Sequence, residues 1–358
     1  MLTGAAVEMR LATPDDLTGI GCVLPDLGGP QFQERFPEGT VADFCHWKYY
    51  GNPTGNAAVG IATDGGRVVS IVAGVPKQVQ LGSETVVGFE LGDFITSIAY
   101  RRQGLFSSLI RLVCQEAAHR GAAFAYVRPN ENSFPTLNKG LSFPEVETIS
   151  ECRYVVPSGL IHRKMGISPE LLRELGVDWL ARRFFLPSSA SSVAIESVNR
   201  FGKEMDEFWE RTRRRYSFLL VRDSTYLNWR YADSPTPYLS WVAHRNGSVT
   251  GYLTAFMNRS QTNAQLVDLF CDPEDAETAA ALVRTSMETM LAAGVQSIWT
   301  WVPQVTADSV CHRFLKRAFP IKTKPQLHMV LRFLDGRLNT PLLPSSGWQL
   351  AMGDFDGV

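Results

Sequence analysis

The chain has 358 residues, enough for two domains of ordinary size, and its apolar fraction of 45% is typical of a globular protein with a hydrophobic core. Its 35 basic and 36 acidic residues leave a net charge of −1, so there is no basic excess to bind nucleic acid. No apolar run reaches the roughly 18 residues of a membrane helix, and the six cysteines show no metal-ligand spacing. We therefore expect a cytoplasmic protein with reduced thiols, no bound metal, and no nucleic-acid or membrane partner.

The first ninety residues alternate between strand and turn patterns. Thr13 and Pro14 are typical of a helix start. Further along, Asp64-Gly65-Gly66 is a hairpin signature between two apolar runs. We expect strands at 7–12, 58–62, 68–75, 79–81 and 85–89. Together they predict an antiparallel meander, interrupted by an aromatic segment at 43–53.

The stretch from residue 93 to 143 predicts a strand, a basic turn with a glycine, a helix and a second strand. An apolar strand at 94–98 leads into the turn 100–104, after which apolar residues recur at helical spacing. The N–H groups at a helix N-terminus lack intrahelical acceptors and carry partial positive charge. Gly104 allows backbone to approach a ligand, and Arg101 and Arg102 add full charges. The turn therefore indicates a site for an anion the size of a pyrophosphate.

The order and spacing of these residues resemble the Gcn5-related N-acetyltransferase (GNAT) superfamily. The acyl-CoA turn of that family follows Arg/Gln-x-x-Gly-x-Gly/Ala. Residues 101–106 match it except at the last position, where Phe106 replaces a small residue. The form Tyr-Arg-x-x-Gly-x-Phe is similar to the branch that acylates nucleotide-linked amino sugars. The resemblance implies that the amides of the turn hold the CoA pyrophosphate. It also implies that a loop asparagine, Asn130 or Asn132, contacts the pantetheine arm.

The residues that the resemblance assigns to an acyl-CoA co-substrate lie at a strand end, in the turn, in the first helical turn and in the following loop. They are Ile95, Thr96, Ser97, Ile98, Arg101, Arg102, Gln103, Gly104, Leu105, Phe106, Ser107, Asn130 and Asn132. A strand, turn and helix with one glycine and two arginines also occur in many α/β proteins that have no CoA site. The donor is expected to be acetyl-CoA or another acyl-CoA.

The pattern of the first half returns after residue 225. Residues 226–235 repeat the Trp, cation, Tyr and Pro of residues 44–53, with Trp229 in the place of Trp47. Asp93 and Phe143 are 50 positions apart, and Asp268 and Phe319 are 51 apart. This agreement predicts an internal duplication.

The two copies differ at the turn. Residues 272–276, Asp-Pro-Glu-Asp-Ala, stand where the first copy has its basic glycine turn. Acids cap a helix well, but they repel phosphate and leave no glycine for close approach. We therefore expect only the first copy to bind acyl-CoA.

These patterns predict an α/β (α+β) protein made of two GNAT-like domains, each a mixed, mainly antiparallel twisted sheet flanked by helices. We expect the N-terminal domain at 1–156, a connecting region at 157–200, and the C-terminal domain with its degenerate turn at 201–358. The connecting region contains a helical run at 168–186 and a linker-like stretch at 187–192. The aromatic tail, 348–356, is expected to pack against a domain.

Acyl transfer to an amine requires a base, polarisation of the thioester carbonyl and a proton for the leaving thiolate. The resemblance places the base on the strand before the turn, which offers Glu90 and Asp93. A spacing of three puts them on opposite faces of a regular strand unless Gly92 introduces a bulge, so we expect only one to face the acceptor. Asp93 is favoured because Asp268 occupies its place in the second copy, although a structural aspartate would recur in the same way. Many GNAT enzymes protonate the thiolate with a tyrosine in the next helix, but residues 134–139 contain none.

The resulting hypothesis is an acyl-CoA-dependent N-acyltransferase that moves an acetyl or other short acyl group to an amine of a small molecule. The resemblance suggests a nucleotide-linked amino sugar, with an amino acid, a polyamine, an aminoglycoside or a protein lysine as alternatives. A non-catalytic GNAT-like module that senses CoA or scaffolds a partner is the competing hypothesis. Acyl transfer to an oxygen is a third.

Overall fold

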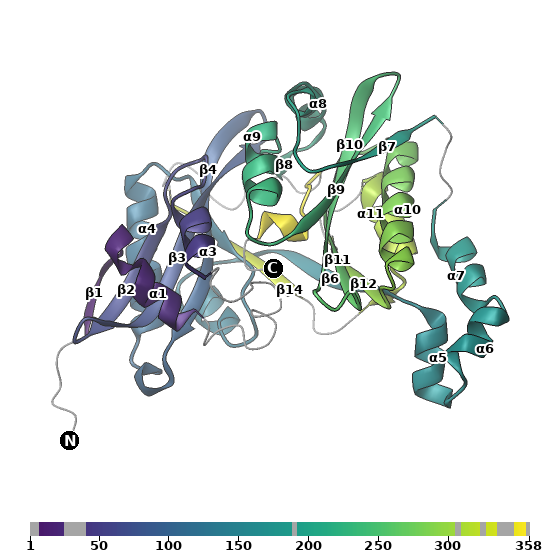
Figure 1. The fold of residues 1–358 in the computed structure, drawn as a ribbon. Helices are drawn as coiled ribbons and strands as arrows, with labels where there is room; N and C mark the ends of the chain where they lie inside the picture. The colour runs from purple at the N-terminus through teal and green to yellow at the C-terminus, as the bar shows by residue number, and fades with distance from the viewer. Residues whose placement is uncertain are drawn as a thin grey trace.

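In this computed structural model, residues 7–24, 41–187, 192–304, 309–322, 327–334 and 347–355 are described. They form one mixed, mainly antiparallel sheet with helices on both faces, which confirms the expected fold class. Figure 1 shows the N-terminal strands at one end of the sheet, the later strands at the other, and the C-terminal segment between them.

The described residues of the first half form six strands and three main helices. The strands are β1 (Glu8–Leu11), β2 (Ala58–Asp64), β3 (Arg67–Leu81), β4 (Glu84–Thr96), β5 (Phe124–Val127) and β6 (Glu145–Val155). The helices are α1 (Leu17–Val23), α3 (Val41–Tyr49) and α4 (Leu105–His119), and a π-helical turn spans Thr136–Gly140. The predicted hairpin at residues 64–66 is present between β2 and β3. The strands expected at 68–75 and 79–81 form a single strand, β3.

Pro76 does not interrupt β3, because β2 ends opposite Gly74. On that edge of β3 the next strand, β8, pairs only from Val79 onward, so Pro76 lies between the two partners and no ladder hydrogen bond is lost there. The carbonyl oxygen of Pro76 accepts instead from the side chain of Asn52 at 2.9 Å.

The second half contributes the remaining strands and helices. The strands are β7 (Ala194–Val198), β8 (Phe218–Leu220), β9 (Tyr238–Arg245), β10 (Ser248–Met257), β11 (Asn263–Cys271), β12 (Ser297–Pro303), β13 (Ile321–Lys322) and β14 (Leu327–Phe333). The helices are α8 (Glu204–Thr212), α9 (Ser224–Leu227), α10 (Ala276–Ala292) and α11 (Val310–Ala318), and a second π-helical turn spans Asn228–Ala232. The order of elements therefore resembles that of the first half.

The two halves share strands. The main path of the sheet runs β1-β2-β3-β4-β5-β14-β6-β12-β11-β10-β9-β7, so β14 pairs with β5 while β6 pairs with β12. The last strand of each half thus lies beside a strand of the other half. The expected boundary at residue 156 stays a prediction, and main-chain hydrogen bonds cross between the two halves on both of these strands.

Each half contains one pair of parallel strands that diverge. β4 pairs with β5 only over Gly88–Glu90 and Phe124–Tyr126. β11 pairs with β12 only over Asn263–Gln265 and Ser297–Trp299. Beyond these residues each pair opens into a wedge. Helix α4 packs on β2 and β3 next to the first wedge.

The C-terminal segment crosses the middle of the molecule (Figure 1). Trp348 is buried and stacks on Phe218, with ring centroids 4.3 Å apart. Phe355 packs against Tyr126 of β5 and Trp301 of β12. The expected packing of the tail is confirmed up to Phe355, and residue 356 lies outside the described residues.

The connecting region folds into three short helices, α5 (Pro157–Met165), α6 (Pro169–Glu174) and α7 (Val177–Phe185). The helical run expected at 168–186 is divided at Gly176, whose φ of 74° does not continue a right-handed helix. Most of the linker-like stretch, residues 188–191, lies outside the described part of the chain. Among the described helices, none has the length and apolar content needed to cross a membrane.

Candidate functional site

The turn between β4 and α4 is fixed by local hydrogen bonds. Ser70 Oγ donates to the carbonyl oxygen of Ile95 at 2.7 Å, and the Ser97 N–H donates to Val69 at 2.9 Å. The hydroxyl of Tyr100 donates to Asp64 of the β2–β3 hairpin at 2.5 Å. The predicted turn is therefore anchored to β3 and to the hairpin, and its conformation does not depend on a ligand.

Gly104 occupies the N-cap position of α4 with a φ of 80°. A Cβ added there would have no atom within 4 Å, so the space in front of the helix N-terminus is open. The first intrahelical hydrogen bond runs from Ser108 to Gly104, and the N–H groups of the preceding helical residues have no carbonyl one turn earlier to bind. Arg101, Arg102 and Gln103 are exposed beside this opening. The arrangement can bind an anion.

Phe106 does not cover the turn. Its ring packs edge-on against Phe94, with centroids 5.1 Å apart, and both rings lie against the core beneath α4. This orientation explains how a large side chain stands where the family pattern has a small one. Leu105 is buried in the same core, whereas Ile98 is largely exposed on the other side of the turn.

The loop after β5 forms its own cap. The side-chain oxygen of Asn130 accepts from the N–H groups of Asn132 at 3.0 Å and Ser133 at 2.9 Å. It thus initiates the short helical segment that follows. Asn130 and Asn132 are both exposed at the open end of the first wedge.

Glu90 and Asp93 lie on the same face of β4, against the expectation that only one would face the acceptor. The pairing of β4 with β3 shifts register between Gly92 and Ile95, and Asp93 has a φ of 52°. In a regular strand Leu91 and Ile95 would lie on the same face. Here Leu91 packs under α4 and Ile95 packs on the opposite face near α3, so the bulge reverses the alternation of side chains. Asp93 is therefore turned to the α3 face, where Glu90 also points.

Asp93 is held by two residues of α3. Its Oδ2 accepts from the hydroxyl of Tyr49 at 2.7 Å and pairs with Lys48 Nζ at 2.8 Å. The Lys48 side chain is 2% exposed and that of Asp93 10%. Burial, together with the nearby Asp93 carboxylate, raises the pKa of Tyr49 well above its usual value, so Tyr49 remains a donor.

Glu90 belongs to a buried cationic and aromatic cluster that joins both halves. Its carboxylate lies 3.9 Å from Lys77 Nζ, and Lys77 lies over the ring of Trp229 at 4.6 Å. Arg128, just beyond β5, lies over Trp301 at 4.7 Å. Burial lowers the pKa of Arg128, and the Glu90 charge opposes that effect. Sequence reasoning did not single out Lys77 or Arg128, and it noted Lys48 only as the cation of the repeated pattern. The signal for Lys77 was a lone cation inside an otherwise apolar strand.

The second half has the same tyrosine–aspartate contact but in a closed core. Asp268 accepts from Tyr252 at 2.6 Å and from Tyr231 at 3.0 Å, and it pairs with Arg222 at 3.3 Å. Arg222 also pairs with Asp354 at 2.6 Å. Because these groups are fully buried, Asp268 has a structural role.

The N-terminus of α10 is already occupied by side chains. Asp275 accepts from the N–H and the hydroxyl of Thr278, and it pairs with Arg245 at 3.1 Å. Burial alone would raise the pKa of Asp275, but these hydrogen bonds hold it below its usual value. Asp275 thus accepts a hydrogen bond from the N-terminus of α10. The equivalent position of α4 is Gly104, which has no side chain to do this.

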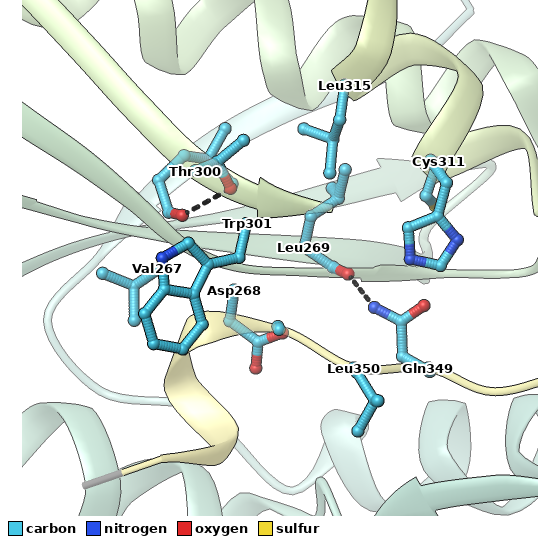
Figure 2. A pocket seen from close by; sticks show the side chains of 12 residues that line it. Val267, Asp268, Leu269, Thr300, Trp301, Cys311, Leu315, Gln349 and Leu350 are labelled. Atoms are coloured by element: carbon cyan, nitrogen blue, oxygen red, sulfur yellow. Dashed lines mark hydrogen bonds between the residues drawn. The ribbon is translucent and has the colours of Figure 1, made fainter. Parts of the chain in front are cut away.

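The second wedge is filled by the chain itself (Figure 2). The amide of Gln349 donates to the carbonyl oxygen of Leu269 on β11 at 2.7 Å. Leu350 and Thr300 line the same cavity, whose volume of about 10 Å³ is that of one water molecule at most. The C-terminal segment therefore occupies the space between β11 and β12.

The side chain of His328, on β14, contacts Phe134, at the start of the segment 134–139 that contains no tyrosine. Its ring stacks on Phe134, with centroids 4.5 Å apart, and its Nδ1 lies 2.8 Å from Glu145. This position of His328 could not be predicted from the sequence, because the contact depends on the pairing of β14 with β5 and β6.

A hollow of about 400 Å³ opens between the two halves. Asp43, His46 and Trp47 of α3 line one side, and Asp233 and Pro235 line the other. Asp233 also pairs with Arg200. The hollow thus has an aromatic wall and two carboxylates.

Comparisons with known proteins support the fold. Residues 31–136 match the family model for the acetyltransferase (GNAT) domain. No curated protein matches the sequence. A protein from Enterococcus faecalis V583 described as a probable N-acyltransferase has a similar structure, with a TM-score of 0.63 at 12% identity over 92% of this chain and 73% of that one.

Two further solved structures are similar over most of the chain. The GCN5-related N-acetyltransferase from Anabaena variabilis ATCC 29413 has a TM-score of 0.62 at 11% identity, over 92% of this chain and 73% of that one. Saccharomyces cerevisiae N-myristoyltransferase with bound myristoyl-CoA has a TM-score of 0.59 at 12% identity, over 93% of this chain and 84% of that one. At such identities the likeness concerns the fold.

Proposed function

We propose that the protein is an acyl-CoA-dependent N-acyltransferase with two tandem GNAT-type halves, of which only the first binds the donor. The observation that carries the proposal is the open N-terminus of α4 at Gly104, set beside the wedge between β4 and β5. The corresponding helix and wedge of the second half are filled by Asp275 and by Gln349. The matched GNAT domain and the N-acyltransferase folds support the same activity.

The donor would lie along the first wedge. The pyrophosphate would accept hydrogen bonds from the amides of residues 104–107, with Arg101 and Arg102 neutralising its charge. The pantetheine arm would run along the edge of β4 that faces away from β3, over residues 91–96, toward Asn130 and Asn132. The myristoyl-CoA bound to the yeast neighbour supports an acyl-CoA in this fold.

The acceptor would occupy the hollow between the halves. Its volume is within the range of small-molecule sites. Asp43 favours an amine that carries positive charge, whereas Asp233 is already paired with Arg200. A nucleotide-linked amino sugar is the acceptor suggested by resemblance. The Asp43 carboxylate favours a polyamine or another cationic amine over it, because it repels phosphate.

In the reaction, the amine nitrogen attacks the thioester carbonyl carbon, the carbon–sulfur bond breaks and the amine proton is lost. Asp93 is the proposed base, directly or through a water. The described contacts of Asp93 with Tyr49 and Lys48 both fall on Oδ2, so Oδ1 is the atom that would take the proton, and an amine that reaches it would have to extend past α3 from the hollow. Glu90 would hold Lys77 and Arg128 in place beside the wedge. Backbone N–H groups of β4 would polarise the thioester carbonyl.

Release of free thiol from acetyl-CoA in the presence of an amine panel tests the function. Turnover with at least one amine is expected. Asp93→Asn should lower kcat by roughly 10²- to 10⁴-fold while the acetyl-CoA affinity stays within about twofold. Asp15→Asn, at an exposed acid near the start of α1, is the control. Tight acetyl-CoA binding without thiol release from any amine would instead identify a non-catalytic CoA module.

A further inference from the structure

Helices α5, α6 and α7 carry most of the large apolar side chains exposed in the described part of the chain. Six of the nine such residues lie here, with exposures from 48% to 70%. They are Met165, Leu171, Leu175, Trp179, Leu180 and Phe184. The other three, at positions 9, 98 and 321, are scattered over the rest of the molecule. A concentration of this kind marks an interaction surface.

The exposed residues share faces of their helices. On α7, Trp179, Leu180 and Phe184 lie within one arc of the helix together with Arg183, and the buried Asp178 lies on the opposite side. Leu171 and Leu175 are one turn apart at α6. We call these six side chains the apolar surface.

The apolar surface stands away from the sheet. In Figure 1, α5, α6 and α7 project from the end of the molecule near β12 and α10. Asp178 fixes α7 to α5, since its carboxylate accepts from the N–H of Ser158 at 2.8 Å and from its hydroxyl at 2.7 Å. Tyr154 of β6 packs against Phe185, which attaches the end of α7 to the body. A flat partner could therefore reach the apolar surface without contacting the sheet.

The same helices are basic. They carry five exposed cations, Arg163, Lys164, Arg173, Arg182 and Arg183, against the exposed acids Glu170 and Glu174 and the buried Asp178. Five minus three gives +2 for residues 157–187, whereas the whole chain has a net charge of −1. Both arginines of α7 are exposed, Arg183 within the apolar arc and Arg182 one turn after Asp178, while Asp178, the acid of α7, is buried.

We propose that the apolar surface binds the face of an anionic lipid bilayer. Tryptophan, phenylalanine and leucine side chains beside arginines are typical of helices that lie in the interface, with the apolar groups at the acyl boundary and the guanidinium groups at the phosphates. The helices have 9, 6 and 9 residues, so they would lie on the bilayer rather than cross it. This partner was not expected from the sequence, where the helices were expected within a connecting region.

A second copy of the chain fits the apolar surface less well. A twofold contact places the same patch of both chains face to face. It would therefore bring Arg183 of α7, which shares the arc of Trp179 and Phe184, toward the same arginine of the other copy, with no acid of α7 between them. An anionic bilayer instead offers a phosphate for each guanidinium group.

Cosedimentation with lipid vesicles tests this proposal independently of acyl transfer. The full chain is expected to bind vesicles containing phosphatidylglycerol, and to bind pure phosphatidylcholine vesicles at least tenfold more weakly. Trp179→Ser with Phe184→Ser, and separately Arg182→Gln with Arg183→Gln, should each lower the partition to anionic vesicles at least tenfold. The control is Met9→Ser with Ile321→Ser, which removes exposed apolar side chains elsewhere.

Because all four substituted residues of α7 are exposed, their variants should keep the thermal stability of the parent protein. Equal binding to anionic and neutral vesicles, or no binding, would overturn the proposal. So would a concentration-dependent dimer in sedimentation velocity that Trp179→Ser with Phe184→Ser dissociates, because the occupant would then be a second copy.

Discussion

Trp47 and Trp229 donate hydrogen bonds to each other's backbone carbonyl oxygens. The Nε1–O distances are 2.6 Å from Trp47 and 3.1 Å from Trp229, and the rings stack with centroids 5.1 Å apart at 19°. Trp47 and Trp229 hold the same place in the predicted repeat, and a reciprocal contact between them is what an approximate twofold axis would produce. The exchange of β6 and β14 between the halves has the same symmetry. The two halves of the chain are thus joined through mutual contacts, as the subunits of a dimer are.

This contact should contribute to the stability of the whole molecule. Trp229→Phe removes one hydrogen bond, leaves the Trp47 carbonyl oxygen buried without that donor and weakens the stacking. We expect the free energy of unfolding to fall by about 1–3 kcal/mol, measured by urea denaturation. Trp179→Phe, at an exposed tryptophan, should change it by less than about 0.5 kcal/mol. Equal effects of the two substitutions would show that the reciprocal contact adds nothing.

Asp93 and Asp268 should respond differently to substitution although they occupy equivalent places. Asp268→Asn removes one of the two carboxylates that pair with the buried Arg222 and should destabilise the protein by about 1–3 kcal/mol, without a separate effect on the chemical step. Asp93→Asn weakens the pair with the buried Lys48, so it should also destabilise the protein, but it should in addition lower the turnover of the folded enzyme. Urea denaturation and thiol release measured on both variants separate these roles. A stable Asp268→Asn protein, or a fully active Asp93→Asn protein, would contradict this assignment.

His312 should make the protein sensitive to acid. Burial lowers the pKa of its imidazole to about 4, below the unfolded value of 6.5. A group whose pKa is depressed in the folded state binds its proton more readily when unfolded. The stability it contributes is therefore fully present above pH 6.5 and is lost as the pH falls toward 4. At pH 5 the loss is about 2 kcal/mol.

The matching experiment compares unfolding at pH 7.5 and pH 5. His312→Gln should lose less stability on acidification than the parent protein, whereas His119→Gln, at an exposed histidine, should lose as much as the parent. An unchanged pH dependence in His312→Gln would show that other groups cause the acid sensitivity.

His328 is the group we expect to protonate the leaving thiolate, in place of the missing tyrosine. His328→Gln should lower kcat with acetyl-CoA about tenfold or more without weakening acetyl-CoA binding. An acetyl donor whose thiol has a lower pKa should be almost insensitive to the substitution, since its thiolate leaves without a proton. If both donors slow equally, His328 acts through structure, by its contacts with Phe134 and Glu145.

The local elements were predictable from the sequence because short-range patterns determine them. The hairpin at residues 64–66 and the helix after Gly104 lie where turn residues and apolar spacing placed them. The sequence identified Gly92 as a place where a bulge could put Glu90 and Asp93 on one face, but it did not predict that the bulge forms, since that depends on a single residue with positive φ. No local sequence pattern predicts that β14 pairs with β5. The two strands are about two hundred positions apart, and their pairing depends on the packing of the whole core. For the same reason the position of Gln349 in the second wedge appears only in the folded chain.

The central claim is that the amides at the start of α4 hold acyl-CoA. Gly104 and Gly121 flank α4, both have a φ of 80°, and neither would have an atom within 4 Å of an added Cβ. Substitution by glutamate therefore imposes a similar backbone strain at either end, but only Gly104→Glu places a carboxylate at the proposed pyrophosphate site. Titration calorimetry with acetyl-CoA should show at least a hundredfold weaker binding for Gly104→Glu and a change of less than about threefold for Gly121→Glu. Parental affinity in Gly104→Glu, or equal losses in both variants, would contradict the account.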